Sequence, residues 1–197
     1  IPVMAVGRIN DPLTANRVVE KDQADLVCIG RGLLADPELP NKARAGRLDE
    51  IRICIACNTC MQSIFRKGRI ECLVNPTLGR EKEMTCVATR KSKKIMVIGG
   101  GPGGLNVAWV AAKRGHKVHI FEKRSVLGGQ LLPGSIPGHK RELRSLIKFQ
   151  KKRIEKFGVT CHLNHAVKAT DIQRFNPDVV VLATGSQPVL PPVDGIH

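Results

Sequence analysis

The chain of 197 residues carries a formal net charge of +15 and is 42% hydrophobic, which leaves room for one large or two small domains with a core. It has no apolar run near eighteen residues and no signal-like start, so we expect a cytoplasmic protein without a membrane span. The excess charge lies mostly in the second half. It lacks the accompanying aromatic residues of a stacking platform, which argues against nucleic acid as a partner.

The first fifty residues predict two βα units. The apolar run at residues 2–6 is typical of a strand buried on both faces, and Asp11 is placed to cap the helix that follows. Residues 26–29 predict the next strand. A second helix is expected to begin at Asp36 and to stop at Gly46.

Both predicted strands end in a Gly-Arg pair, namely Gly7-Arg8 and Gly30-Arg31. Glycine lets a backbone amide approach a ligand closely, and a guanidinium can bind phosphate with two hydrogen bonds. In a (β/α)₈ barrel the phosphate site typically lies in the loops after the last two strands. Residues 1–50 therefore predict either the end of such a barrel with its phosphate site, or two ordinary loop arginines.

Four cysteines follow, with Cys54, Cys57 and Cys60 close together and Cys72 returning from a short loop. Three thiols within one or two turns of backbone can face one point, and the fourth can close a four-thiolate site. Bacterial-type cubane iron–sulfur clusters are commonly held in this way, whereas structural zinc sites usually use two separated pairs. The spacing favours an iron–sulfur segment at residues 51–76, with zinc and buried free cysteines as alternatives.

Residues 77–93 are charged and weakly periodic, and we expect a connecting arm there. A strand at residues 94–98 then enters a glycine-rich turn, which leads to a helix at 105–114 and a strand at 117–121. The second strand ends at Glu122. This order of strand, glycine-rich turn, helix, strand and acidic residue is the fingerprint of a dinucleotide-binding unit.

Each residue of the fingerprint has an expected task. Gly99 makes the tight turn, Gly101 lets a pyrophosphate approach, and Gly104 allows close packing of helix against strand. Glu122 is expected to accept hydrogen bonds from ribose hydroxyls. The alternative, a glycine-rich turn without a ligand, would have no need of Glu122.

The rest of the second half holds a basic helix and a last strand. Residues 140–156 predict an amphipathic helix whose outer face is either simply solvated or docks an acidic protein partner or a phosphorylated substrate. The last predicted strand, at residues 178–183, ends in Ala183-Thr184-Gly185. With Gly128-Gly129-Gln130, this ending resembles the FAD-binding half of flavoprotein disulfide-reductase-like folds, in which an NAD(P)-binding unit is inserted after that strand.

Taken in order, these segments closely resemble the old yellow enzyme-like NADH:flavin oxidoreductases of the 2,4-dienoyl-CoA reductase, enoate reductase and trimethylamine dehydrogenase group. The matching stretches are residues 30–38, 54–58, 72–76, 97–104, 127–131 and 179–185. The resemblance implies an α/β protein that starts with the C-terminal end of a TIM (β/α)₈ barrel and continues into a four-Cys iron–sulfur segment. The implied domains are the barrel end at 1–50, the cluster segment at 51–76, the arm at 77–93, and a Rossmann-like FAD/NAD(P)-binding domain at 94–197. We expect the chain to be a fragment, truncated before the NAD(P)-binding insertion.

The resemblance also implies ligand sets. Cys54, Cys57, Cys60 and Cys72 would hold a [4Fe-4S] cluster. Gly7, Arg8, Gly30 and Arg31 would contact the phosphate of FMN. FAD, or ADP in the amine dehydrogenases, would be contacted by Gly99, Gly101, Gly104, Glu122, Gln130, Ala183, Thr184 and Gly185. Two residues separate Cys57 from Cys60, as in the amine-dehydrogenase branch, whereas many of the reductases have three there.

The function implied by the resemblance is an electron relay. NAD(P)H would reduce FAD, electrons would pass singly through the cluster, and FMN would deliver hydride to an activated C=C bond of an unsaturated acid or acyl-CoA. Catalytic groups would lie on earlier barrel strands, so no catalytic residue is named and the fragment alone is expected to be inactive. One alternative is an amine dehydrogenase that donates electrons to an acceptor protein, which could be an acidic carrier. Another is a metal-stapled dinucleotide-binding module without redox turnover.

Overall fold

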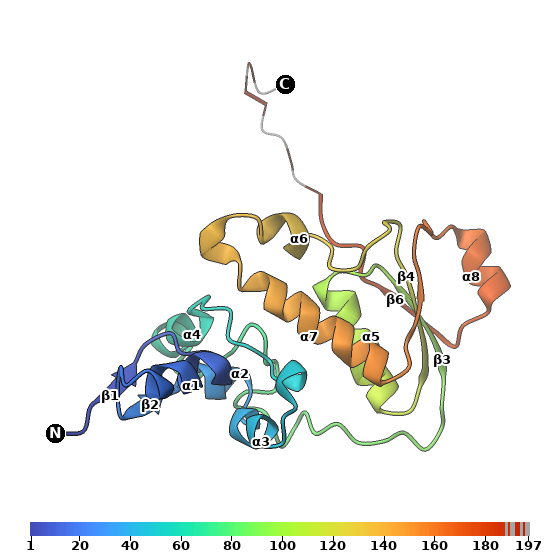
Figure 1. The fold of residues 1–197 in the computed structure, drawn as a ribbon. Coiled ribbons are helices and arrows are strands. Elements are labelled where there is room, and N and C mark those ends of the chain that lie inside the picture. Colours follow the sequence, from blue (N-terminus) through green and yellow to red (C-terminus); the bar gives the residue numbers. More distant parts are fainter. Residues whose placement is uncertain (188, 190–191, 194, 196–197) are drawn as a thin grey trace.

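The computed structural model describes residues 1–187, 189, 192–193 and 195. In this part, two parallel sheets of two and four strands lie at opposite ends of the molecule (Figure 1). The small sheet pairs β1 (Met4–Val6) with β2 (Leu26–Cys28), and α1 (Pro12–Glu20) connects them. The predicted cap of α1 is confirmed, because the Asp11 carboxylate accepts a hydrogen bond from the Thr14 amide at 2.9 Å.

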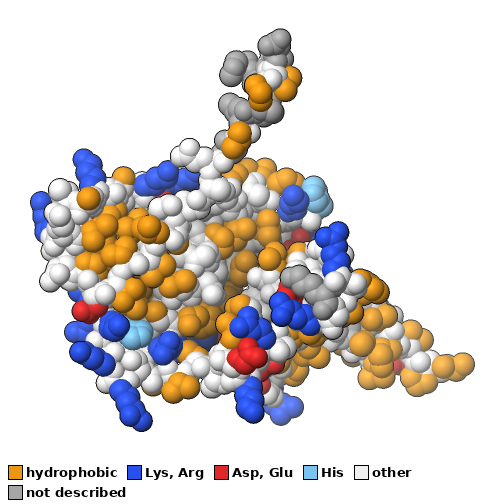
Figure 2. All heavy atoms as spheres, turned by 180° about the vertical axis from the view of Figure 1, so that it is seen from behind, with side chains coloured by type: hydrophobic (Ala, Val, Ile, Leu, Met, Phe, Trp, Pro, Cys, Tyr) orange, Lys and Arg blue, Asp and Glu red, His pale blue; other side chains and the backbone are white. Residues whose placement is uncertain are grey.

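The predicted burial of the first strand is wrong for the chain as described. Met4 and Val6 are 55% and 74% exposed, and Leu26 on the neighbouring strand is 50% exposed. A sheet of two strands gives each strand one neighbour, so an apolar run can form a strand there without being covered. Figure 2 shows the hydrophobic side chains that gather at this end of the molecule.

The segment after β2 forms more helices than predicted. Helix α2 (Arg31–Ala35) precedes α3 (Leu39–Arg44), and the short η1 (Leu48–Glu50) follows. The predicted helix therefore begins at Leu39 and not at Asp36, because Asp36 has an extended backbone and its carboxylate accepts from the Glu38 amide at 3.1 Å.

The cysteine segment contains a helix that the sequence pattern did not predict. This helix, α4 (Thr59–Lys67), begins within the cysteine motif and ends at Gly68, whose φ of +64° suits glycine. The described residues 77–93 form neither helix nor strand, in keeping with an arm.

The larger sheet carries the predicted strands. Strands β3 (Lys94–Ile98) and β4 (Lys117–Phe121) lie where the sequence placed them, and β5 (Thr160–His162) and β6 (Val179–Leu182) complete the order β5-β4-β3-β6. The first strand in sequence, β3, thus lies between β4 and β6. The strand order therefore reverses at β3, and open parallel sheets bind ligands at such a point, beyond the carboxyl ends of the strands.

Helices cover this sheet. On one face, α5 (Pro102–Lys113) and α7 (Leu143–Lys156) pack together over the core, and the short α6 (Leu131–Gly134) and η2 (Gly138–Lys140) precede α7 (Figure 1). Helix α8 (Ala169–Phe175) lies beside the sheet, where Phe175 contacts Phe121 edge to face. The core between α5, α7 and the sheet consists of Ile95, Val97, Leu105, Ala108, Trp109, Val118, Ile120, Leu127 and Ile154. None of the described helices combines the length and apolarity needed to cross a bilayer.

Candidate functional site

The glycines at the end of β3 bring three backbone segments into close contact. A Cβ on Gly99, which has φ +114°, would lie 2.2 Å from the Ala183 carbonyl oxygen. A Cβ on Gly104 would lie 2.0 Å from the Gly99 carbonyl oxygen. Only glycine therefore fits at these two positions, and it allows β3, α5 and the end of β6 to meet at one edge of the sheet.

A second glycine pair lies against this turn. The Gly128 amide donates to the Gly100 carbonyl at 2.8 Å, and a Cβ on Gly129 would lie 2.8 Å from the Gly101 Cα. A Cβ on Gly101 itself would meet only Gly129, at 3.9 Å. Gly101 caps the N-terminus of α5 and thus leaves space beside the helix end, as a pyrophosphate contact requires.

Glu122 is buried at the same edge, directly after β4. One carboxylate oxygen accepts from the Gly100 amide at 2.7 Å and the other from the Arg124 amide at 2.9 Å. The carboxylate therefore holds the glycine-rich turn in place. Each oxygen has a further lone pair, so a hydrogen bond from a ribose hydroxyl is compatible with this arrangement.

The remaining residues predicted to contact FAD lie on two loops at this edge. Ala183, Thr184 and Gly185 follow β6, and the Gln130 side chain donates to the Ser186 backbone carbonyl. The structure thus joins the loop before α6 to the loop after β6. Sequence reasoning did not find Ser186, because it has no motif of its own.

The cysteines differ in exposure. Cys54 and Cys60 are buried, Cys72 is half-buried, and Cys57 is exposed. Left-handed residues at Ala56 (φ +53°) and Asn58 (φ +57°) bend the chain between the first three thiols, and the Ala56 amide donates to the Cys54 sulfur at 3.4 Å. Amide hydrogen bonds to sulfur are one of the means by which proteins tune iron–sulfur clusters.

The surroundings of Cys54 shift the pKa of its thiol in both directions. Burial raises the pKa of the Cys54 thiol, and the charges of Cys72 and Cys57 act in the same direction, while the Ala56 amide and Arg31 lower it.

Ser63 donates to the Cys60 carbonyl at 2.9 Å and accepts from the Glu71 amide at 2.9 Å, which ties α4 to the return that carries Cys72. Within the described residues, no three His, Cys, Asp or Glu side chains form a ready metal-binding group. The donor set nevertheless fits an iron–sulfur cluster, since four thiols lie on one short segment with an amide already directed at sulfur.

The two Gly-Arg loops are held by other segments. Gly7 has φ +116° and Arg8 has φ +52°, and the Arg8 side chain forms an ion pair with Glu142 just before α7. Arg31 donates to the Asn58 side chain in the cysteine segment. The structure therefore gives each arginine a partner outside residues 1–50, which the sequence pattern did not indicate.

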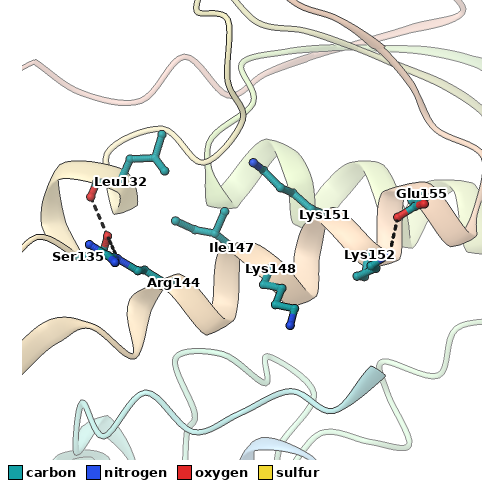
Figure 3. A pocket seen from close by; sticks show the side chains of 8 residues that line it. All are labelled: Leu132, Ser135, Arg144, Ile147, Lys148, Lys151, Lys152 and Glu155. Carbon is teal, nitrogen blue, oxygen red and sulfur yellow. Dashed lines mark hydrogen bonds and ion pairs between the residues drawn. The ribbon is translucent and has the colours of Figure 1, made fainter. Parts of the chain in front are cut away.

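A pocket outside the predicted sites runs along α7 toward α6 (Figure 3). Its floor includes Leu132 and Ile147, and four basic side chains line it, with Glu155 as the one acidic member of the lining. The lining residues are Leu132, Ser135, Arg144, Ile147, Lys148, Lys151, Lys152 and Glu155. The pocket confirms that the outer face of this helix is basic.

Two family models match the chain. The model described as pyridine nucleotide-disulphide oxidoreductase matches residues 71–175 and, in a second alignment, residues 93–197. The model described as the NADH:flavin oxidoreductase / NADH oxidase family matches residues 1–50. One model thus matches the first fifty residues and the other matches the second half of the chain, and both descriptions name oxidoreductases.

Individual relatives match the chain over nearly its whole length. An NADH oxidase from Thermoanaerobacter brockii is 41% identical over 198 residues, and a cinnamate reductase from Clostridium sporogenes is 38% identical over 196 residues. Each alignment covers 99% of this chain and 30% of the relative. This chain therefore spans less than a third of the length of these relatives.

Solved structures include both of the enzyme types that the sequence left open. A 2-naphthoyl-CoA reductase in complex with 2-naphthoyl-CoA superposes with a TM-score of 0.92 at 36% identity, over 99% of this chain and 30% of that one. Histamine dehydrogenase from Rhizobium sp. 4-9 superposes with a TM-score of 0.89 at 28% identity, over 100% of this chain and 29% of that one. Reductases and amine dehydrogenases thus share the fold of this chain.

Proposed function

Because the chain belongs to the pyridine nucleotide-disulphide oxidoreductase family, we propose that it is the electron-transfer part of an iron–sulfur flavoprotein. In this proposal NAD(P)H supplies electrons through FAD and a [4Fe-4S] cluster to FMN, which reduces an activated C=C bond in an unsaturated acid or acyl-CoA. The cofactors would supply the hydride and single-electron transfer, and the protein binds and orients them. A cytoplasmic location is part of the proposal.

The observation that carries the proposal is the four-thiol segment between two regions of flavin-enzyme sequence. Residues 1–50 match a flavin oxidoreductase model and residues 93–197 a dinucleotide-binding one, and Cys54 to Cys72 lie between them. A hydride cannot cross between two distant flavins, whereas single electrons can pass through a cluster. The position of the thiols therefore suits a relay.

The residues of this chain bind and orient the proposed groups. Gly99, Gly101 and Gly104 leave room for the pyrophosphate of FAD, Glu122 holds their turn and accepts from a ribose hydroxyl, and the other contacts come from Gln130, Ala183, Thr184 and Gly185. Gly7, Arg8, Gly30 and Arg31 bind the FMN phosphate. Cys54, Cys57, Cys60 and Cys72 hold the cluster. The substrate and any catalytic residue lie outside this chain.

The test is an anaerobic titration of the intact protein with NADH and with NADPH, followed by flavin absorbance. We expect one of them to bleach the flavin. The variant G101A should bind FAD about tenfold more weakly, which is about 1.4 kcal/mol, because the added methyl group enters the pyrophosphate space. The fold itself should tolerate the methyl group, since the nearest protein atom would be 3.9 Å away. The control G103A adds a methyl group with nothing within 4 Å and should bind FAD normally.

A second candidate is an amine dehydrogenase that passes its electrons to an acidic carrier protein. The basic pocket along α7 favours it, as does the spacing of Cys57 and Cys60. In that case an amine would bleach the flavin and NAD(P)H would not. A protein that contains zinc and is colourless would contradict both candidates and leave a metal-stapled dinucleotide-binding module.

A further inference from the structure

A buried polar network joins the three segments that surround the cysteines. Asp36 and Asn75 are each 3% exposed. The Asp36 carboxylate accepts from the Arg52 amide at 2.8 Å, and the Arg52 guanidinium donates to the Asn75 side-chain oxygen at 2.6 Å. Asn75 in turn donates to the Leu34 carbonyl at 2.9 Å. The segment before Cys54 and the segment after Cys72 are therefore both hydrogen-bonded to residues 34–36.

The charges of this network do not cancel. Lys42 forms an ion pair with Asp36 at 2.5 Å, and both side chains are largely buried. The side-chain partner of Arg52 is the neutral Asn75, and its ring neighbour Phe149, at 5.3 Å, is neutral as well. One positive charge, that of Arg52, is therefore uncompensated in this network. Arg52 lies two residues before Cys54.

Arg52 is half-buried, and a cation that has lost part of its hydration is stabilised by a nearby anion, because removing an unpaired charge from water is costly. Holding Asn75 in place would not need a cation, since a neutral donor could do so. In the described part of the chain, the Arg52 Nε atom is buried without a hydrogen-bond partner, so hydrogen bonding alone does not account for the guanidinium. Asn75, to which the guanidinium donates, lies three residues after Cys72, so this bond holds the Arg52 charge at the return of the cysteine segment.

We propose that Arg52 is a positioning residue and fixed cation for the four-thiolate site, and that it raises the reduction potential of the cluster held there. This inference rests on the proposed function. Reduction adds an electron to an already anionic group, and a nearby half-buried cation stabilises the added charge more strongly than a cation in water would. The bond to Asn75 keeps the charge beside the return that carries Cys72.

The experiment is a redox titration of the cluster, read by EPR, in the intact protein purified without oxygen. We expect R52Q to lower the equilibrium constant for one-electron reduction of the cluster by about tenfold. The reduction potential would then fall by about 59 mV. R52K should keep a potential near that of the wild type, because its charge remains. It should lose iron to a chelator faster, since an ammonium group does not reproduce the planar guanidinium bond to Asn75.

Arg153 provides the matched control. It lies over the same ring, 5.7 Å from the centroid of Phe149, but it stands on α7, outside the cysteine segment, and pairs with Glu50 at 3.8 Å. R153Q should therefore leave the cluster potential close to that of the wild type. A shift in R153Q as large as that in R52Q would overturn the inference, because it would reflect general disturbance of the interior.

The outcomes separate this inference from the function on which it rests. Wild-type protein without iron would overturn both. An iron-loaded wild type whose potential is unchanged in R52Q would overturn the inference alone. If R52Q retains no cluster, R52K decides: a retained cluster with wild-type potential supports a role for the charge, and loss of the cluster from R52K as well contradicts it.

Discussion

The central strands of the larger sheet, β3 and β4, bury Val97 and Ile120 completely, whereas β1 and β2 leave Val6 and Leu26 with 74% and 50% of their surface exposed. The strands themselves are similar, because each is short and contains apolar residues; β1 and β3 are followed directly by glycine, β2 by Ile29 and Gly30, and β4 by Glu122. Their surroundings differ. Strand β3 has a strand on either side, with α5 and α7 packed over one face of the sheet, whereas among the described residues β1 pairs with β2 alone.

The comparison shows that an apolar run specifies a strand but not its burial. The free energy gained from apolar surface depends on what covers it. In the larger sheet the covering elements belong to the chain itself. In the small sheet the described residues supply only part of the cover, so apolar side chains face outward (Figure 2).

The largest expected effect separates the two sheets directly. I120A should lower the free energy of unfolding by about 2–5 kcal/mol, because it leaves a cavity in a filled core. V6A should change it by no more than about 0.5 kcal/mol, since Val6 is mostly exposed. Urea unfolding of this chain measures both values. A V6A cost as large as that of I120A would show that β1 is covered after all.

A smaller effect tests how closely the glycine-rich turn is packed. G104A should cost about 1–3 kcal/mol, because its methyl group would lie 2.0 Å from the Gly99 carbonyl oxygen and force α5 away from β3. The neighbouring G103A meets nothing within 4 Å and should be neutral or stabilising, since alanine favours a helix over glycine. Thermal unfolding compares the two variants. Equal losses would mean that the close approach is unimportant for stability.

The smallest effect concerns the link between the two regions. Glu50, at the end of the first region, pairs with Lys156 at 2.5 Å and Arg153 at 3.8 Å on α7. The hydrogen bond from Lys156 lowers the pKa of Glu50, burial opposes this, and the charges of Lys156, Arg47 and Arg153 lower it further. Because the pKa in the folded chain is lowered, the stabilisation is present above the ordinary glutamate value of about 4.3 and is lost as the pH falls through the folded value.

E50Q should accordingly cost about 0.5–1 kcal/mol at pH 7, a range suited to a mostly solvent-screened pair. The difference between E50Q and the wild type should shrink as the pH is lowered below about 4.3. Urea midpoints measured across this range test the sign. A difference that grows toward low pH would contradict the ion-pair explanation.

Local signals predicted much of the fold. The apolar strands at 94–98 and 117–121, the Asp11 cap and the glycine-rich turn depend on neighbours in sequence, and the structure has them. Helix α4 was missed because the cysteine spacing dominated that segment. The late start of α3 follows from hydrogen bonds of Asp36 to backbone amides nearby and sixteen residues away, and the latter contact has no local signal.

In the candidate site, the close glycine contacts were predictable, but the connections between segments were not. Glycines at positions 99 and 104 could be assigned to close backbone contacts because no other residue tolerates them. The partners of Arg8 and Arg31, namely Glu142 and Asn58, could not, since they meet only when separate segments fold together. The Arg52 network was hidden for the same reason.

The most direct test of the relay is the amount of iron and acid-labile sulfide per chain in anaerobically purified protein, with EPR spectra before and after dithionite. We expect about four of each, as a cubane cluster requires, and a reduced-cluster signal that C72A abolishes. C161A, which changes an exposed cysteine outside the segment, should leave the signal intact. Zinc in place of iron, or a folded protein without metal, would contradict the electron-transfer function.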